Sequence, residues 1–337
     1  MPEDTAATLG EDGIIALFLD DRRPPDTVVI PNGDDAAAWR FAPDEASVIT
    51  TDSLVEGQHF DLAYTPPQHV GRKLMTVNLS DLAAMGARPA FVLLSVCFDR
   101  STPAAVIQQV AHGVRAGCRV AKTSIIGGNT TGIAGPMVLT ATVIGARSPH
   151  GLLKRSGACA GQAIYVSGTL GDAAAGLHLV LAGGRPSPSS SAHRLFERLT
   201  NPTARTELGQ RLSESGIVHA MCDISDGFGR DLRRLLAYDN LGATVDVMRM
   251  PTSGALRAYA AERDRDPASF AMAGGEDYEL LFTADAEKES LIADISNEVG
   301  VAVTRVGLVT ATGQVRARHP DGRHTEVPTG FEHFETQ

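Results

Sequence analysis

The feature that most constrains this sequence is the stretch of residues 68–97, in which a helical pattern gives way to an extended one. Apolar residues recur at the spacing of one helix face from Val70 to Met85. Gly86 is a typical helix stop, and Pro89 precedes an apolar run over residues 90–97 that is typical of a buried strand. This order of elements predicts an α/β unit.

Within this helix, Asn78 and Asp81 are three residues apart, so their side chains leave the same side of the helix. An amide and a carboxylate one turn apart can hold a hard cation or a water bound to one. The alternative is an ordinary surface aspartate near a solvated helix end. The pair alone does not decide between these interpretations.

The length of 337 residues is too great for one ordinary core and suggests two domains. No apolar run approaches the roughly 18 residues that span a bilayer, and the acidic N-terminus lacks the order of a signal peptide. The four cysteines form no Cys-x-x-Cys pair, which argues against a disulfide framework or a zinc site. We therefore expect a cytoplasmic protein without a membrane partner.

The net charge of −10 is unevenly distributed along the chain. Residues 101–200 carry 2 acidic and 9 basic side chains, whereas residues 1–100 carry 16 acidic and 7 basic ones. An acidic total argues against nucleic acid as the main partner. The basic middle third suits an anionic ligand that metal ions bridge to the acidic segments, although a solvated basic face would give the same pattern.

The order of predicted elements gives an α/β (α+β) chain of two halves. The first half is predicted to contain helices over residues 11–21, 68–85 and 102–120 and strands over 27–30, 36–41, 48–55, 90–98, 124–132 and 137–146, with 124–132 running into a glycine turn. The second half is predicted to contain strands over 163–167, 242–247 and 278–283, near His219 and after Val301, and helices over 172–181, 192–199, 203–214, 228–238 and 286–299. Residues 147–160 are rich in turn formers, so we predict domains over 1–148 and 149–337.

Four acidic motifs fall at predicted strand ends or helix edges. They are Gly33-Asp-Asp35, Thr50-Thr-Asp52, Asn78 with Asp81, and Asp223-Ile-Ser-Asp226. Carboxylates that lie close together repel unless cations neutralise them, so a shared site would require metal ions. Each motif alone is also compatible with a turn or a helix N-cap.

The usual nucleotide-binding motifs are absent. None of the four lysines follows a glycine, which excludes a Walker A loop, and there is no Gly-x-Gly-x-x-Gly fingerprint or Gly-x-Ser-x-Gly elbow. A glycine turn over residues 127–132 could hold phosphate through backbone N–H groups, which is a weak signal by itself. Phosphate bound through metal, with assistance from arginine, is the interpretation that remains.

The motifs together resemble a known family. In chain order they are Gly33-Asp-Asp-Ala36, Thr50-Thr-Asp-Ser-Leu-Val-Glu-Gly57 with His59-Phe60, Asn78-Leu-Ser-Asp-Leu-Ala-Ala-Met-Gly-Ala87, Arg155-Ser-Gly157, Asp223-Ile-Ser-Asp-Gly227 and Gly274-Gly-Glu-Asp-Tyr-Glu-Leu280. This ordered set, from about residue 10 to Phe334, resembles the thiamine-monophosphate kinases of the AIR synthase-like ATP-binding superfamily.

The resemblance implies a two-domain AIR synthase-like fold whose N-terminal mixed-sheet domain forms a homodimer. It implies transfer of the ATP γ-phosphate to thiamine monophosphate, with several Mg²⁺ ions as cofactors. The implied metal ligands are Asp35, Thr50, Thr51, Asp52, Asp81, Asn129, Asp223 and Asp226. The implied ATP contacts are Gly128, Asn129, Arg155 and Ser225, and the implied contacts to the thiamine end are His59, Glu276 and Phe331.

This residue inventory agrees with direct phosphoryl transfer. The second pKa of a phosphate monoester is about 6, so at neutral pH its oxygen is already a largely ionised nucleophile. Such a reaction needs charge neutralisation and in-line positioning, and it needs no covalent catalytic residue. Each implied contact also has a structural alternative: His59 as a strand-end residue, Glu276 as a brace for the next strand, Phe331 in packing, and Arg155 in a surface ion pair.

One departure from the family pattern leaves the acceptor open. Asn129 stands where the family usually has aspartate, so this position keeps an oxygen ligand but loses a negative charge. We therefore predict weaker occupancy of one metal position. The alternatives are a paralogue with another phosphorylated acceptor, a non-catalytic protein that binds nucleotide or thiamine phosphates, and a metal-dependent phosphatase. A selenophosphate synthetase is disfavoured, because residues 1–30 contain neither Cys nor Lys.

Overall fold

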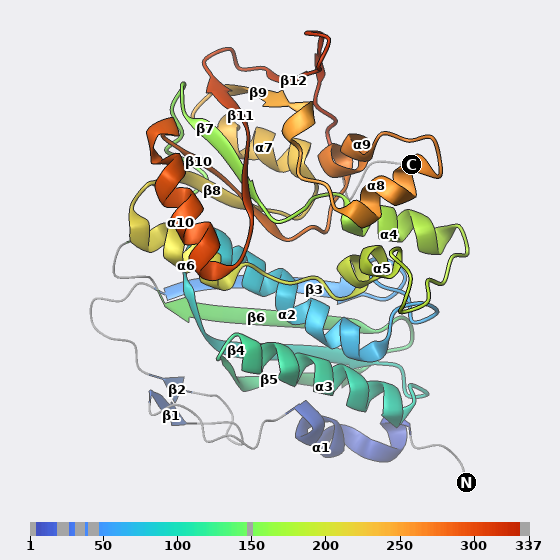
Figure 1. The fold of residues 1–337 in the computed structure, drawn as a ribbon. Helices are drawn as coiled ribbons and strands as arrows, with labels where there is room; N and C mark the ends of the chain where they lie inside the picture. The colour runs from blue at the N-terminus through green and yellow to red at the C-terminus, as the bar shows by residue number, and fades with distance from the viewer. Residues whose placement is uncertain (1–4, 19–26, 31–37, 40–46, 147–150, 331–337) are drawn as a thin grey trace. The chain divides into compact units, whose positions relative to one another are not determined.

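The computed structural model describes residues 5–18, 27–30, 38–39, 47–146 and 151–330 (Figure 1). The chain divides into two compact units. Unit 1 comprises Met1–Leu82 and Ala87–Arg147, and unit 2 comprises Ala83–Gly86 and Ser148–Gln337. Each unit combines a sheet with helices, so the expected two-part α/β (α+β) fold class is confirmed.

Unit 1 is built on a four-stranded mixed sheet. Its elements are α1 (Ala6–Phe18), β1 (Val28–Ile30), β2 (Ala38–Trp39), β3 (Ser47–Val55), α2 (Pro67–Ala84), β4 (Arg88–Phe98), α3 (Ala104–Val120), β5 (Ser124–Gly132) and β6 (Val138–Ala146). The sheet order is β3-β6-β4-β5, and only β4 and β5 are parallel. The short strands β1 and β2 form a separate antiparallel pair.

Helices α2 and α3 lie side by side, because glycines allow their backbones to touch (Figure 1). A Cβ atom on Gly71 would lie 2.0 Å from the carbonyl oxygen of Val110, and one on Gly113 would lie 2.0 Å from that of Gln68. Burial along β3 alternates: Val48 and Leu54 are buried, whereas Ile49 is 63% exposed. The sheet thus has one face packed into the core and one open face.

Unit 2 is built on a seven-stranded sheet in the order β13-β12-β9-β11-β7-β10-β8. Its strands are β7 (Ala163–Ser167), β8 (Val218–Ile224), β9 (Gly242–Asp246), β10 (Glu279–Ala284), β11 (Val303–Thr310), β12 (Val315–Arg318) and β13 (His324–Glu326). Its helices are α4 (Asp172–Leu181), α5 (His193–Thr200), α6 (Thr206–Ser215), α7 (Phe228–Ala237), α8 (Gly254–Ala261), α9 (Pro267–Ala273) and α10 (Glu289–Val299), with 3-10 turns η1 (Val247–Arg249) and η2 (Ala286–Lys288).

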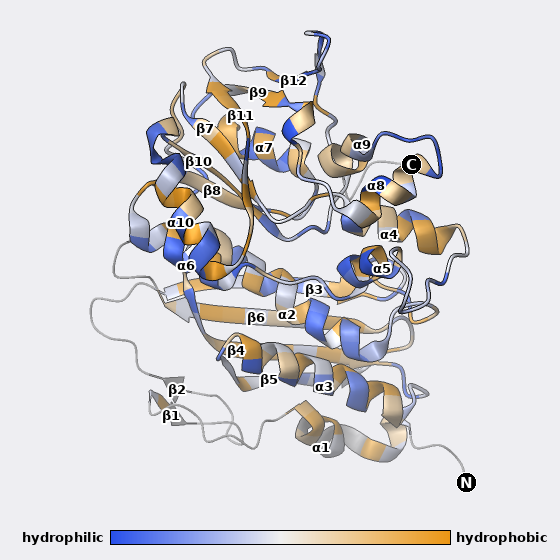
Figure 2. Ribbon diagram, in the orientation of Figure 1, coloured by the Kyte–Doolittle hydropathy of each residue, from blue (hydrophilic) through white to orange (hydrophobic). Residues whose placement is uncertain are grey.

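Both faces of the unit 2 sheet are packed. Phe228 and Leu232 of α7 belong to one hydrophobic cluster, and Leu212 of α6 and Ile292 of α10 belong to another. The interior strand β7 is buried along its whole length and is hydrophobic in most of it (Figure 2). Burial on both faces explains why such strands read as continuous apolar runs rather than alternating ones.

Most predicted elements lie where the sequence pattern placed them, and the differences have local causes. The first helix begins at Ala6 rather than residue 11, and residues 19–21 of that prediction lie outside the described part of the chain. Helices α8 and α9 were not predicted, although each has an N-cap: Ser253 accepts from the Leu256 N–H and Asp266 from the Ala268 N–H. No helix among the described residues is long and apolar enough to cross a membrane.

Candidate functional site

Strand β3 presents three predicted site residues on two different faces. The hydroxyl of Thr50 donates to the carboxylate of Asp81 on α2, with 2.5 Å between Oγ1 and Oδ2. The next residue, Thr51, instead has its Oγ1 2.9 Å from Oγ1 of Thr142 on β6. Because successive strand residues point to opposite faces, Thr50 and Asp52 share the face toward α2 whereas Thr51 lies on the open face.

Asn78 has a structural role that the sequence did not reveal. It is fully buried; its Oδ1 accepts from the Asp52 N–H at 3.0 Å, and its Nδ2 donates to the Leu74 carbonyl at 3.0 Å. The amide of Asn78 thus makes structural contacts with β3 and with its own helix, and whether Asn78 and Asp81 together hold a cation stays a prediction. The contact with the Asp52 N–H fixes β3 against α2 and so sets the position of Asp52.

The glycine turn predicted at residues 127–132 is a continuous part of strand β5. A Cβ atom on Gly128 would lie 1.9 Å from the carbonyl oxygen of Leu94, so glycine is required by the close approach of β4. The prediction of a glycine turn is therefore wrong, whereas contact of this segment with phosphate stays a prediction. Asn129 is exposed and pairs in register with Ser95, in the row that continues to Thr140 and Ser53.

His59 lies in the turn after β3, and two contacts fix it. Its Nδ1 accepts from the Val55 N–H at 3.1 Å, so the neutral ring carries its proton on Nε2. The fully buried Lys73 of α2 donates from Nζ to the His59 carbonyl at 2.9 Å. Backbone and ring are therefore both oriented, which is what a ligand-contacting residue requires.

In unit 2, the end of β8 and the loop after it carry the second acidic motif. Asp223 is buried near the end of β8, opposite Leu280 of β10. The Ser225 and Asp226 N–H groups both donate to Oδ2 of Asp231, each at 3.1 Å. Asp231 lies in the first turn of α7 and reaches back to the loop, so the helix anchors the loop that precedes it.

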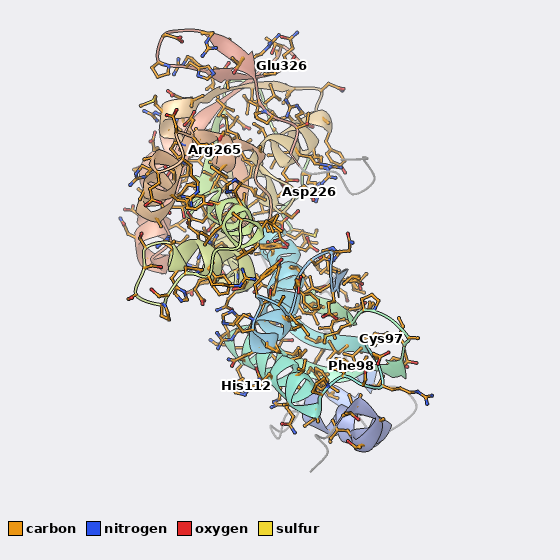
Figure 3. The ribbon with its side chains drawn as sticks, turned by 90° about the vertical axis from the view of Figure 1, so that its right-hand side faces the viewer. Cys97, Phe98, His112, Asp226, Arg265 and Glu326 are labelled. Carbon is orange, nitrogen blue, oxygen red and sulfur yellow. The ribbon has the colours of Figure 1, made fainter. Side chains whose placement is uncertain are left out.

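Two arginines of α7 pair with Asp226, whose position is labelled in Figure 3. Nη1 of Arg234 lies 2.6 Å from Oδ2 of Asp226 and 3.4 Å from Oδ1 of Asp231, and Nε of Arg230 lies 3.6 Å from Oδ2 of Asp226. Burial raises the pKa of the Asp231 carboxyl from 3.8 to about 6, and the nearby charge of Asp226 adds to the rise. The loop thus collects negative charge that arginine only partly balances.

The loop that contains Glu276 packs on this acidic loop. The N–H of Glu276 donates to the Ser225 carbonyl at 2.7 Å, and the N–H of Tyr278 donates to that of Ile224 at 2.8 Å. Between them, the fully buried Asp277 accepts from the Gly171 N–H at the start of α4. Burial raises the pKa of Asp277 well above its usual value, against the opposing charge of Arg198.

Arg155 is exposed and makes no hydrogen bond or ion pair with any described residue. The backbone carbonyl of the preceding residue, Lys154, accepts from the Met221 N–H at 2.8 Å, which holds this segment against the acid-bearing strand β8. A guanidinium that has no partner among the described residues and lies beside a strand that ends in acids is suited to bind phosphate.

Two predicted residues, Asp35 and Phe331, lie outside the described part of the chain. Within the described ranges, no group of three or more His, Cys, Asp or Glu side chains could hold a metal ion. The donors that are described are carboxylate and hydroxyl oxygens, which suit Mg²⁺ by type. The magnesium site therefore stays a prediction.

Sequence reasoning missed the residues that support these loops. They are Lys73, Arg198, Arg205, Asp231, Arg234 and Glu279. Lys73 offered a signal, because a lysine among the apolar positions of a buried helix needs a polar partner. Asp231 gave a weaker signal. It is an acid in the first turn of a helix, but acids are common there because they interact favourably with the helix dipole, whether or not they also hold a loop.

The comparisons with known proteins identify the class of this fold. Residues 33–146 match the family described as "AIR synthase related protein, N-terminal domain", and residues 160–320 match "AIR synthase related protein, C-terminal domain". The two matches cover most of the chain and fall in its two halves. The molecule is thus an AIR synthase-related protein of two domains.

More similar proteins identify the particular family within this class. The thiamine-monophosphate kinase of Rhodopirellula baltica is 32% identical over 97% of this chain and 98% of its own length. The crystal structure of thiamine-monophosphate kinase from Stenotrophomonas maltophilia K279a is 35% identical, with a TM-score of 0.81 over 93% of this chain and 95% of that one. AaThiL complexed with AMPPCP and TMP is 30% identical, with a TM-score of 0.77 over 97% of both chains. The chain belongs to the thiamine-monophosphate kinase family.

Proposed function

We propose that this protein transfers the γ-phosphoryl group of ATP to thiamine monophosphate, giving thiamine diphosphate and ADP. The observation that carries the proposal is the full-length similarity to AaThiL, a structure that holds the ATP analogue AMPPCP together with TMP. The names of the curated relatives agree with it.

We assign nucleotide binding to the acidic motifs and to the segment that contains Arg155. The proposed magnesium ligands are Asp35, Thr50, Thr51, Asp52, Asp81, Asn129, Asp223 and Asp226, and the proposed ATP contacts are Gly128, Asn129, Arg155 and Ser225. These ligands would hold Mg²⁺, which would supply positive charge to balance the phosphates. The guanidinium of Arg155, which pairs with no side chain in the described part of the chain, and the anchored loop at Ser225 support this assignment.

The acceptor end is assigned to His59, Glu276 and Phe331. Nδ1 of His59 accepts from the Val55 N–H, and this contact orients the ring that we propose to contact the acceptor substrate. Glu276 is half-buried at the tip of a loop whose other side chains are buried, which suits a carboxylate directed at an organic ligand.

The reaction we propose is direct and in line. The acceptor phosphate oxygen is largely ionised at neutral pH, so no residue of the chain has to remove a proton from it. The protein positions the two phosphates and balances their charge, which accounts for the absence of a recognisable nucleophile motif.

We further propose that the protein is a homodimer that pairs through the open face of the β3-β6-β4-β5 sheet. Ile49 is 63% exposed on this face, and the neighbouring residues Thr51 and Ser53 are exposed as well. A second copy packed on this face would remove Ile49 from water, which supports the proposal.

The test is to mix the protein with Mg·ATP and thiamine monophosphate and to separate ADP and thiamine diphosphate by chromatography. Equal amounts of both products, absent when thiamine replaces its monophosphate, are expected. ADP without thiamine diphosphate would refute the proposed acceptor, and inorganic phosphate in its place would indicate a phosphatase. Bound ATP without turnover would indicate a binding protein.

A further inference from the structure

The loop that carries Glu276 has a strained backbone. Glu276 and Tyr278 have φ values of 64° and 50°, in the left-handed region that non-glycine residues rarely adopt. They flank Asp277, so two unfavourable conformations occur within three residues. Such strain persists only where surrounding contacts impose it, and it gathers at functional sites.

Part of this constraint comes from one side of the loop. The N–H groups of Glu276 and Tyr278 donate to the carbonyls of Ser225 and Ile224. The carboxylate of Asp277 accepts from the N–H of Gly171, the N-cap of α4. These contacts fix where the loop lies. They leave the carbonyl of Asp277, which sets the direction of the chain into Tyr278, to be held by another group.

Arg198 of α5 holds that carbonyl. Its Nη2 donates to the Asp277 carbonyl oxygen at 2.7 Å and to Oε1 of Glu279 at 3.0 Å. A single nitrogen therefore joins the two residues that flank Tyr278. The Nε of Arg198 is buried without a hydrogen-bond partner among the described residues. The contacts of this guanidinium are thus directed at the loop.

Glu279 does not depend on Arg198 for its charge balance. Arg205 makes a bidentate pair with it, at 2.6 Å from Nε to Oε2 and 2.5 Å from Nη2 to Oε1, and the hydroxyl of Ser167 donates to Oε2 at 2.6 Å. A buried carboxylate with a bidentate arginine and a further donor is well satisfied. Removing Arg198 therefore leaves Glu279 neutralised.

We propose that Arg198 is a positioning residue for the acceptor substrate: by tying the Asp277 carbonyl to Glu279 it keeps Glu276 in the left-handed conformation that presents its carboxylate to thiamine monophosphate. The inference rests on the proposed function. The Ser225 carbonyl accepts from the Glu276 N–H, but the N–H groups of Ser225 and Asp226 are anchored by Asp231, and the nucleotide loop keeps this anchor without Arg198.

The experiment compares Arg198→Met, Arg198→Lys and wild type. Arg211→Met is the matched control, because Arg211 also pairs with carboxylates, those of Glu214 and Glu298, on the exposed surface of the same unit. For each protein we would measure kcat, the KM values for thiamine monophosphate and ATP, the Tm, and the Kd for thiamine monophosphate by calorimetry without ATP.

Arg198→Met is expected to raise both the KM and the Kd for thiamine monophosphate about tenfold, because the binding-competent loop becomes a minor population. The KM for ATP is expected to stay within about twofold of wild type, since its loop keeps its anchor. Arg198→Lys keeps one charged donor, so its KM is expected to lie between the two. It also provides a folded comparison if the methionine variant does not fold.

Unchanged KM and Kd for thiamine monophosphate in either Arg198 variant would overturn the proposal. Equal rises in both KM values, together with a lower Tm, would also overturn it, because they would show a general structural role. Failure of the proposed function has a different signature: wild-type protein itself would form no thiamine diphosphate.

Discussion

Asp231→Asn should stabilise the metal-free protein at neutral pH although it alters a buried residue. The carboxylate of Asp231 is 4% exposed and lies close to Asp226, and its pKa is raised to about 6. The folded state therefore prefers the protonated form. The stabilisation that the protonated Asp231 carboxyl contributes is complete when the pH is below its ordinary pKa of 3.8, and it is lost as the pH rises through about 6.

The magnitude follows from the size of this rise. One pKa unit corresponds to about 1.4 kcal/mol, so at about pH 7.5 the free energy of unfolding is roughly 3 kcal/mol lower than with a carboxyl of ordinary pKa. The amide oxygen of Asn can still accept from the Ser225 and Asp226 N–H groups. The substitution removes the ion pair with Arg234. Because the Arg234 side chain is 40% exposed, this pair contributes about 1 kcal/mol at most to the free energy of unfolding.

We therefore expect Asp231→Asn to unfold with about 2 kcal/mol more free energy than wild type near pH 7.5, and with about the same free energy near pH 4.5. The assay is urea unfolding followed by circular dichroism, with chelator present, at several pH values in this range. Asp239→Asn is the matched control, because Asp239 likewise accepts two consecutive N–H groups, those of Gly157 and Ala158. A difference between Asp231→Asn and wild type that does not grow with pH would refute the reasoning.

Three further predictions concern the proposed activity. Asn129→Asp restores a negative charge at an exposed site position, so the Mg²⁺ concentration for half-maximal activity should fall about threefold; an unchanged magnesium titration would contradict it. Lys73→Met removes the donor to the His59 carbonyl, a loss of about 1–3 kcal/mol, and should raise the KM for thiamine monophosphate in steady-state assays while that for ATP stays constant; a rise in both would indicate general damage. Ile49→Lys places a charge on the open sheet face and should shift the protein to monomer in light scattering with loss of turnover; an active dimer would exclude this face as the interface.

Elements marked by local signals could be predicted from the sequence. The predicted strand over residues 163–167 and helix over 172–181 coincide with β7 and α4. Both have a continuous apolar pattern and a glycine close to one end. The short helices α8 and α9 were not predicted, because eight and seven residues give only a weak periodicity, although α5, which is as short as α8, was predicted.

Local sequence pattern was insufficient at the candidate site where residues far along the chain determine the conformation or the contacts of a segment. The glycines of residues 127–132 look like a turn, but Gly128 is required by the carbonyl of Leu94 on another strand. Spacing puts Asn78 and Asp81 on one side of a helix, but it cannot show that the Asp52 N–H already occupies Asn78. In each case the partner lies too far along the chain for local pattern to find it.

The same argument explains what a recognisable motif contains. In the segment Glu276–Glu279, only Glu276 is proposed to touch a substrate. The other three side chains are buried: Asp277 binds the Gly171 N–H 106 residues away, and Glu279 binds Arg205 74 residues away. Most of the motif therefore specifies the shape of the loop rather than its chemistry. It follows that a chain can match the motif and still position its one functional carboxylate differently, if a distant arginine such as Arg198 is altered.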